Sequence, residues 1–297
     1  MMPTTIRAAV VALTLAWGVE ARLHADETKP AAGLPSLQPL VVIGASASAG
    51  FILAEPFGGP KTPQYQLSRY LDAALIKPGR AATNLASTSF FLNPDVEAKR
   101  QIDGALELKP GTVVAVDFMF WFCYGRAVSE EERPARFERG LALLDRLKCP
   151  MLVGDIPDAS AAVGGMLSQA EMPSAETIGA ANRRLVEWAK GRANTAVLSL
   201  SNFMSCCQAD RSLTVHQRTW ADGETRKLLQ ADKLHPARHG CAALALAIMD
   251  ALVTKAGVIL ESEVRWDADD IYRRVTETPG AAAKSDSAVE PKPPSGT

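Results

Sequence analysis

The sequence predicts an α/β fold in which a five-stranded parallel sheet lies between two layers of helices. Two observations predict it. Short runs rich in apolar and β-branched residues recur along the chain, and stretches with helical periodicity separate them. Most of these runs are continuously apolar rather than alternating, which is typical of parallel strands covered on both faces. The expected architecture is therefore a three-layer α/β/α sandwich.

Five runs supply the expected strands. They lie at residues 40–43, 82–86, 112–117, 150–154 and 195–200. The second run is the least apolar of the five. Each of the later runs follows a helical stretch, as successive βα units require.

Four helices carry recognisable start signals. They are expected to begin at Pro94 and run to Leu108, to follow a capping box of Ser129 and Glu132, to follow Ser174, and to begin at Pro236. Proline suits the first helical position because its missing N–H has no intrahelical partner there. A serine side chain accepts a hydrogen bond from an N–H group that the first turn leaves unpaired.

The two ends of the chain differ from the middle. Residues 8–19 form an apolar stretch after Arg7, too short to span a bilayer, and small residues offer cleavage after Ala21 or Ala25. We expect residues 1–25 to be a secretory signal peptide, the alternative being a short N-terminal anchor. Residues 277–297 are rich in Pro, Ala, Ser and Lys and are expected to form a disordered tail. The protein is then secreted or periplasmic, without stable membrane insertion.

Composition excludes some partners. The chain has 297 residues, 47% of them hydrophobic, and a formal net charge of −1. A near-neutral chain without a basic cluster gives no electrostatic basis for binding nucleic acid. The five cysteines leave at least one thiol unpaired within a monomer, the oligomeric state that we expect.

A candidate nucleophile follows the first expected strand. The chain reads Gly44-Ala45-Ser46 there, and ligands of open parallel sheets gather at the carboxyl ends of the strands. A serine hydroxyl at this turn can act as a nucleophile once a base takes its proton. The alternative is a tight turn in which small residues only permit close packing. Phosphate binding is disfavoured because neither a GxGxxG motif nor a P-loop lysine is present.

A candidate base lies near the C-terminal end of the chain. Asp232 precedes His235 by three residues, and Pro236 follows. The carboxylate can accept from one imidazole nitrogen and leave the other free to take a proton. The alternatives are a solvated histidine, or a metal site formed with His239. Pro236 interrupts the geometry of the metal site, so we expect no metal there. Nucleophilic attack by a serine requires no cofactor, and we expect none.

These two segments resemble the first and last motif blocks of the SGNH (GDSL-like) hydrolases. Gly44-Ala45-Ser46 is similar to the first block, normally Gly-Asp-Ser, and residues 232–236 are similar to the last. The likeness covers residues 40–251 and includes residues 150–157 and Asn182. It implies a flavodoxin-like sandwich, a hydrolase domain at residues 36–276, and a triad in which Ser46 attacks, His235 transfers protons and Asp232 orients the histidine.

The sequence departs from the family pattern in the middle blocks. Residues 84–89 resemble the second block, but the position of its oxyanion glycine is Ser89. The third block, normally Gly-x-Asn-Asp, is replaced at residues 116–120, which contain no asparagine. We assign Ser89, Asn84 and Asp117 to oxyanion or substrate binding. For Asp117 the alternative is a structural carboxylate that accepts backbone N–H groups.

The expected function is hydrolysis of a carboxylic ester, either an O-acyl group on a carbohydrate or a lipid ester, through an acyl-enzyme. Two alternatives use the same fold. One is a non-catalytic protein that binds a glycan or acyl ligand, and the other is an acyltransferase with the same triad. Aromatic residues at 118–124 form either a wall of the substrate pocket or part of the core.

Overall fold

The computed structural model describes residues 36–125 and 129–277. The expected signal peptide at residues 1–25 lies outside the described residues. The expected tail at residues 277–297 also lies outside them, except for Glu277, which is the last residue of a helix.

A five-stranded parallel sheet with the order β2-β1-β3-β4-β5 forms the centre of the fold, as predicted. Its strands are β1 (Leu40–Val42), β2 (Thr83–Asn84), β3 (Thr112–Ala115), β4 (Met151–Gly154) and β5 (Thr195–Leu198). The short β2 matches the least apolar of the expected runs. The order changes direction beside β1, so the segments that follow β1 and β3 diverge to opposite sides and leave room for a site between them.

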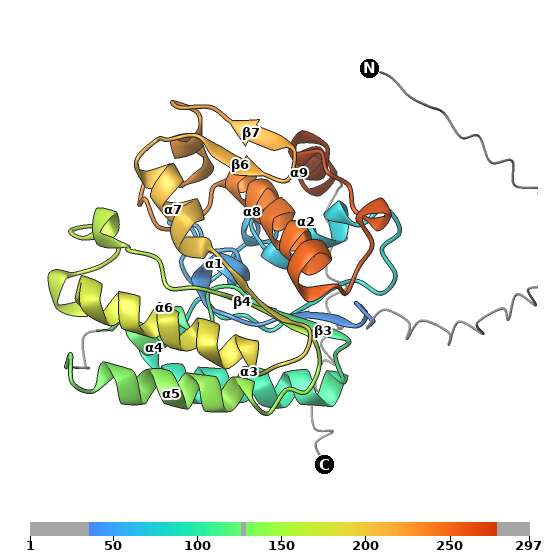
Figure 1. Cartoon of the computed structure of the whole chain (residues 1–297). Helices are drawn as coiled ribbons and strands as arrows, with labels where there is room; N and C mark the ends of the chain where they lie inside the picture. The colour runs from blue at the N-terminus through green and yellow to red at the C-terminus, as the bar shows by residue number, and fades with distance from the viewer. Residues whose placement is uncertain (1–35, 126–128, 278–297) are drawn as a thin grey trace, which may run out of the picture. The chain divides into compact units, whose positions relative to one another are not determined.

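Helices cover both faces of the sheet, so the three-layer α/β/α arrangement is confirmed (Figure 1). One layer contains α3 (Pro94–Leu108), α4 (Phe120–Cys123), α5 (Arg133–Leu144) and α6 (Ala175–Lys190). The other contains α2 (Leu67–Ala74), α7 (Leu200–Gln208), α8 (Arg238–Ala251) and α9 (Ala268–Glu277), while α1 (Ser46–Ala49) follows β1 directly. Alternate residues of β1 face the two layers: Val41 packs on the first and Val42 on the second.

Smaller elements complete the described chain. A hairpin of β6 (Leu213–Val215) and β7 (Arg218–Trp220) follows α7, and the π-helical segment η6 (Leu252–Ala256) extends α8. The short 3-10 helices are η1 (Thr62–Gln64), η2 (Phe90–Leu92), η3 (Ser160–Ala162), η4 (Gln169–Glu171), η5 (Thr225–Leu228) and η7 (Glu261–Glu263).

Two of the four predicted helix starts are confirmed and two are wrong. Helix α3 begins at Pro94, and α6 begins after Ser174, whose hydroxyl accepts the Thr177 N–H at 3.1 Å. Helix α5 begins at Arg133 rather than after Ser129. The reason is Pro134, which has no N–H to donate four residues back and is tolerated only in a first turn. Helix α8 begins at Arg238 because Pro236 is held in an extended bridge to Leu229.

Residues Arg238–Ala256 are the one helical stretch in the described part of the chain that is long and apolar enough to cross a membrane. Within the fold, 67% of its apolar window is buried. It packs on α2, α9 and β5. Core packing therefore accounts for its apolar length. All five cysteines are unpaired, and four of them are buried.

Candidate active site

A turn between β1 and α1 places Ser46 at the carboxyl edge of the sheet. Gly44 has a φ of +150°, and a Cβ atom at this position would overlap the carboxylate of Asp117. The buried amide of Gln101, on α3, donates to the Gly44 carbonyl at 2.9 Å and accepts the Gly44 N–H at 2.7 Å. Because both backbone groups of Gly44 are held, the direction in which the chain leaves β1 is fixed.

Asp117 follows β3 and caps α1 from outside the helix. Its Oδ1 accepts the Ala45 N–H at 3.0 Å and the Ser48 hydroxyl at 2.6 Å, and its Oδ2 accepts the N–H groups of Ala47 at 2.9 Å and Ser48 at 3.2 Å. Helix α1 has no capping side chain of its own. The N-terminal N–H groups of a helix need acceptors and favour a negative charge, and one carboxylate here satisfies three backbone donors.

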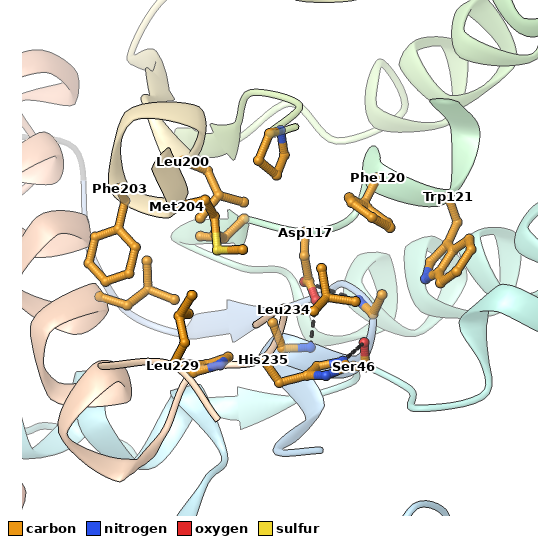
Figure 2. Close-up of a pocket in the computed structure, with 16 residues that line it drawn as sticks. Ser46, Asp117, Phe120, Trp121, Leu200, Phe203, Met204, Leu229, Leu234 and His235 are labelled. Carbon is orange, nitrogen blue, oxygen red and sulfur yellow. Dashed lines mark hydrogen bonds between the residues drawn. The ribbon is translucent and has the colours of Figure 1, made fainter. Parts of the chain in front are cut away.

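The loop before α8 brings His235 to Ser46. Its Nε2 lies 2.8 Å from Ser46 Oγ, and its Nδ1 lies 2.8 Å from Asp232 Oδ2 (Figure 2 shows the first contact). Oδ1 of Asp232 accepts the N–H groups of Leu234 and His235, both at 3.0 Å. Both side chains are nearly buried, with exposed fractions of 3% for His235 and 6% for Asp232. Hydroxyl, imidazole and carboxylate thus form one continuous chain of hydrogen bonds.

The surroundings of Asp232 favour its ionised form. Burial by itself opposes ionisation, but the hydrogen bond and charge of the His235 ring, together with two backbone N–H groups, hold the pKa of the Asp232 carboxyl below its ordinary value. An ionised carboxylate can only accept. Nδ1 of His235 therefore carries the proton that faces Asp232, which leaves Nε2 able to accept one from Ser46.

Two further residues hold the imidazole in place. The ring of Phe51 stacks on that of His235, with 4.1 Å between the ring centroids. The side-chain amide of Gln230 donates to the Phe51 carbonyl at 2.8 Å and to the Pro236 carbonyl at 3.0 Å. Gln230 thereby connects the loop after Ser46 with the loop that carries His235.

A narrow cavity opens beside Ser46 and His235. Its volume is about 50 Å³, on a scale where one water molecule needs about 10–15 Å³. Apart from Ser46, Asp117 and His235, the side chains that line it are apolar. Figure 2 shows Phe120 and Trp121 on one side and Leu200, Phe203 and Met204 on the other.

Few N–H groups near Ser46 are available to a bound molecule. The N–H groups of Ala45, Ala47 and Ser48 are bound to Asp117, whereas no described residue accepts the N–H of Ser46. The indole N–H of Trp121 likewise has no acceptor within the described ranges 36–125 and 129–277, and its ring lines the cavity. In Figure 2 the nitrogen of the Trp121 ring lies on the edge turned toward the other labelled residues. These two groups can donate to a molecule bound in the cavity.

The structure brings four of the six predicted site residues together at one edge of the sheet: Ser46, Asp117, Asp232 and His235. The other two do not line the cavity. Asn84, in β2, donates to the Ser48 carbonyl at 3.3 Å, and the Ser89 N–H donates to Ser87 Oγ at 3.2 Å.

The aromatic run after β3 divides between the two roles considered for it. Phe120 and Trp121 line the cavity. Phe118, Phe122 and Tyr124 are fully buried in the core. The Tyr124 hydroxyl donates to the Pro157 carbonyl at 2.7 Å, so even its polar atom has a structural role.

Sequence reasoning missed Gln101, Gln230 and Phe51. For Gln101 a signal exists, because it shares a helix face with Ala98, Ile102 and Ala105, where an uncharged amide is unexpected among apolar residues. For Gln230 and Phe51 the sequence offers no comparable signal. Their contacts join segments about 180 residues apart in the chain.

The described residues contain no group of three or more His, Cys, Asp or Glu side chains arranged to hold a metal ion. Comparison with known proteins adds no relative: no family model, no curated protein and no solved structure matches the chain. What can be concluded about function therefore depends on a hydroxyl, an imidazole and a carboxylate in hydrogen-bonded sequence beside an apolar cavity.

Proposed function

We propose that the protein is a serine hydrolase that cleaves carboxylic esters, with Ser46 as nucleophile, His235 as general base and acid, and Asp232 as the residue that orients His235. The observation that carries the proposal is the hydrogen-bonded chain Ser46–His235–Asp232, with both contacts at 2.8 Å. The tautomer of His235 that an ionised Asp232 favours is the one that ester hydrolysis by serine requires.

The reaction proceeds in two half-reactions. Nε2 of His235 takes the Ser46 proton while Oγ bonds to the ester carbon, and the carbonyl π electrons move to its oxygen. When the tetrahedral intermediate collapses, the bond to the alcohol oxygen breaks and His235 gives it the proton. Water then attacks the acyl-enzyme through the same steps, which releases the acid and restores Ser46.

The intermediate needs hydrogen-bond donors for its negative oxygen. Among the described residues, the N–H of Ser46 and the indole N–H of Trp121 support this role, because neither has an acceptor and both belong to residues that line the cavity. Preorganised donors of this kind supply much of the rate acceleration in acyl transfer. The role that the SGNH pattern gives to an asparagine falls, in this proposal, to Trp121.

The likeness of residues 44–46 and 232–236 to SGNH blocks supports the same proposal. We propose a divergent SGNH hydrolase, exported by the leader at residues 1–25. Acyl transfer to a second alcohol would use the same residues as hydrolysis. Analysis of the products distinguishes the two reactions.

The experiment is labelling of the folded protein with a fluorophosphonate probe, followed by mapping of the modified peptide. We expect phosphonylation at Ser46, no labelling of Ser46→Ala and strongly reduced labelling of His235→Ala. Ser160→Ala is the matched control, because Ser160 is exposed on η3 and its hydroxyl takes no part in the site. A folded protein that remains unlabelled and does not turn over esters would exclude the mechanism and favour a binding protein, whereas ester turnover that survives in Ser46→Ala would exclude Ser46 as the nucleophile.

A further inference from the structure

The walls of the cavity beside Ser46 are almost entirely apolar. They come from the segments after β1, β3 and β4, from α7 and α8, and from the loop before α8. They include Phe120, Trp121, Leu200, Phe203 and Met204. Many of them are buried in the free protein.

The three polar side chains in the cavity are already engaged. Both carboxylate oxygens of Asp117 accept hydrogen bonds from the turn, and both ring nitrogens of His235 are bound to Asp232 and Ser46. The proposed function assigns the free N–H groups of Ser46 and Trp121 to the carbonyl oxygen, so a sugar placed here would bury most of its hydroxyl groups without partners, which costs free energy for each group. An alkyl chain has no such cost and gains from burial.

We propose that this cavity binds the acyl chain of the substrate, and that the protein prefers esters of unbranched apolar acids of about four to six carbons. The inference rests on the proposed function, because it places the reacting carbonyl at Ser46. The acyl group stays attached to Ser46 until water releases it in the second half-reaction, so a narrow apolar pocket next to Oγ suits it. The alcohol must leave after the first half-reaction and therefore needs an open path.

The volume of the cavity sets the length of the acyl chain that it can hold. At about 50 Å³ it holds roughly three to five water-sized groups, and a methylene group is close to a water molecule in size. The carbonyl carbon stays outside, at Ser46. Acetyl would leave most of the cavity empty, and an octanoyl chain would require the walls to move.

Met204 on α7 is the wall residue best suited to a test. It lies beside Leu200 and Phe203 on the side of the cavity opposite Phe120 and Trp121 (Figure 2). Its side chain is 4% exposed and flexible, so truncation deepens the cavity without removing a hydrogen bond. Met249, on α8, is fully buried but does not line the cavity, which makes it a matched control for the loss of a core methionine.

The first experiment measures kcat/KM for p-nitrophenyl esters from acetate to dodecanoate, and separately for acetates of alcohols of increasing chain length. We expect kcat/KM to rise about fourfold for each added acyl methylene up to about hexanoate, and to fall from octanoate onward. The alcohol series should vary far less. A flat acyl profile, or a profile that follows the alcohol chain, would overturn the inference while the proposed function stands.

The second experiment repeats the acyl series with variants. Met204→Ala should move the optimum toward longer chains by about two carbons, whereas Met249→Ala should keep the wild-type optimum even where its stability is lower. An unchanged optimum in folded Met204→Ala would contradict the assignment of this wall. The wild-type profile still tests the inference where Met204→Ala does not fold.

A binding measurement gives a readout that needs no turnover. Ser46→Ala is titrated with hexanamide and with acetamide, which are neutral and are not hydrolysed by the variant. We expect hexanamide to bind at least about tenfold more tightly, because four further methylene groups are buried. Equal affinities for the two amides would overturn the acyl-chain inference, whether or not the protein has esterase activity. The proposed function is tested separately, by labelling of Ser46.

Discussion

Ser48 donates its hydroxyl to Oδ1 of Asp117 at 2.6 Å, although the two residues are 69 positions apart in the chain. The contact belongs to a set of four in which Asp117 accepts this hydroxyl and the N–H groups of Ala45, Ala47 and Ser48, but not the N–H of Ser46 that lies between them. The carboxylate therefore fixes α1 and leaves the N–H of Ser46 without an acceptor among the described residues. Asp117 is a positioning residue in this arrangement.

Asp117→Asn should lower both stability and activity. An amide accepts only through its oxygen, so its NH₂ group would face N–H donors that now bind the second carboxylate oxygen. Leaving buried donors unpaired costs about 2–4 kcal/mol of unfolding free energy. Displacement of Ser46 should reduce kcat about a hundredfold with a smaller change in KM.

Urea unfolding and steady-state kinetics check this prediction. Ser48→Ala serves as the comparison, because it removes one donor and leaves the carboxylate with its three backbone partners. We expect its loss of stability to be about 1 kcal/mol. Equal effects of the two substitutions would show that the charge of Asp117 is not what positions the turn.

Trp121→Phe should reduce kcat by about a hundredfold and leave KM nearly unchanged. The substitution keeps an aromatic ring between Phe91 and Phe120 and removes the indole N–H together with part of the ring surface, a loss of surface that the control variant below shares. An interaction made in the transition state but not with the bound ester affects kcat and kcat/KM equally. Trp220→Phe is the control, because Trp220 lies in β7 and does not line the cavity. Full activity of Trp121→Phe would remove the indole from the proposed oxyanion site.

Gln230→Leu should reduce kcat and cost about 1–3 kcal/mol of stability. The carbonyls of Phe51 and Pro236 lose their shared donor, and the stacking of Phe51 on His235 loses its support. Gln208→Leu is a close control: its amide also donates to this loop, at the Lys233 carbonyl, but at the surface. We expect the control to change stability by less than about 0.5 kcal/mol. Thermal unfolding and steady-state kinetics of the two variants decide between a local and a general effect.

The sheet could be predicted well because each strand is recognisable from its own short stretch of sequence. The strands near residues 40, 112 and 150 are buried on both faces, so continuous apolar character marks them directly, whereas the edge strand near residue 195 is fully buried on one face only. Helix starts were predictable where the signal lies at the helix's own first turn, as with Pro94 and Ser174. The start of α5 was missed because Pro134 outweighs the capping signal of Ser129 and Glu132.

The site was predictable only in part, because only some of its residues stand in such short local patterns. Ser46, Asp232 and His235 each stand in a short local pattern, so their residue types and order pointed to one another. The contacts that hold them are different, since Gln101, Asp117 and Gln230 act across 57, 70 and 179 positions of sequence. The wall of the cavity on α7 was also hidden, because Leu200, Phe203 and Met204 read as ordinary core residues.

Asp232→Asn tests the orienting carboxylate in activity and in stability. The NH₂ group of asparagine would donate to Nδ1 of His235 and place the ring proton on Nε2, where it blocks acceptance from Ser46. We expect kcat to fall by about 10⁴-fold. Any fluorophosphonate labelling of Ser46 should slow in parallel, since it depends on the same proton transfer.

The stability of the two proteins should differ in its dependence on pH. The ordinary pKa of the carboxyl is 3.8, and in the folded protein the pKa of Asp232 is lower. A depressed folded pKa means that the unfolded chain binds the proton more readily, so this carboxyl stabilises the fold above the unfolded pKa and loses that contribution as pH falls through the folded pKa. Asparagine does not titrate. The difference in unfolding free energy between wild type and Asp232→Asn should therefore be constant above about pH 5 and shrink below pH 3.8. Urea unfolding between about pH 2.5 and pH 7 measures it, and a difference that stays the same over the whole range would mean that folding leaves the pKa of the Asp232 carboxyl at its ordinary value.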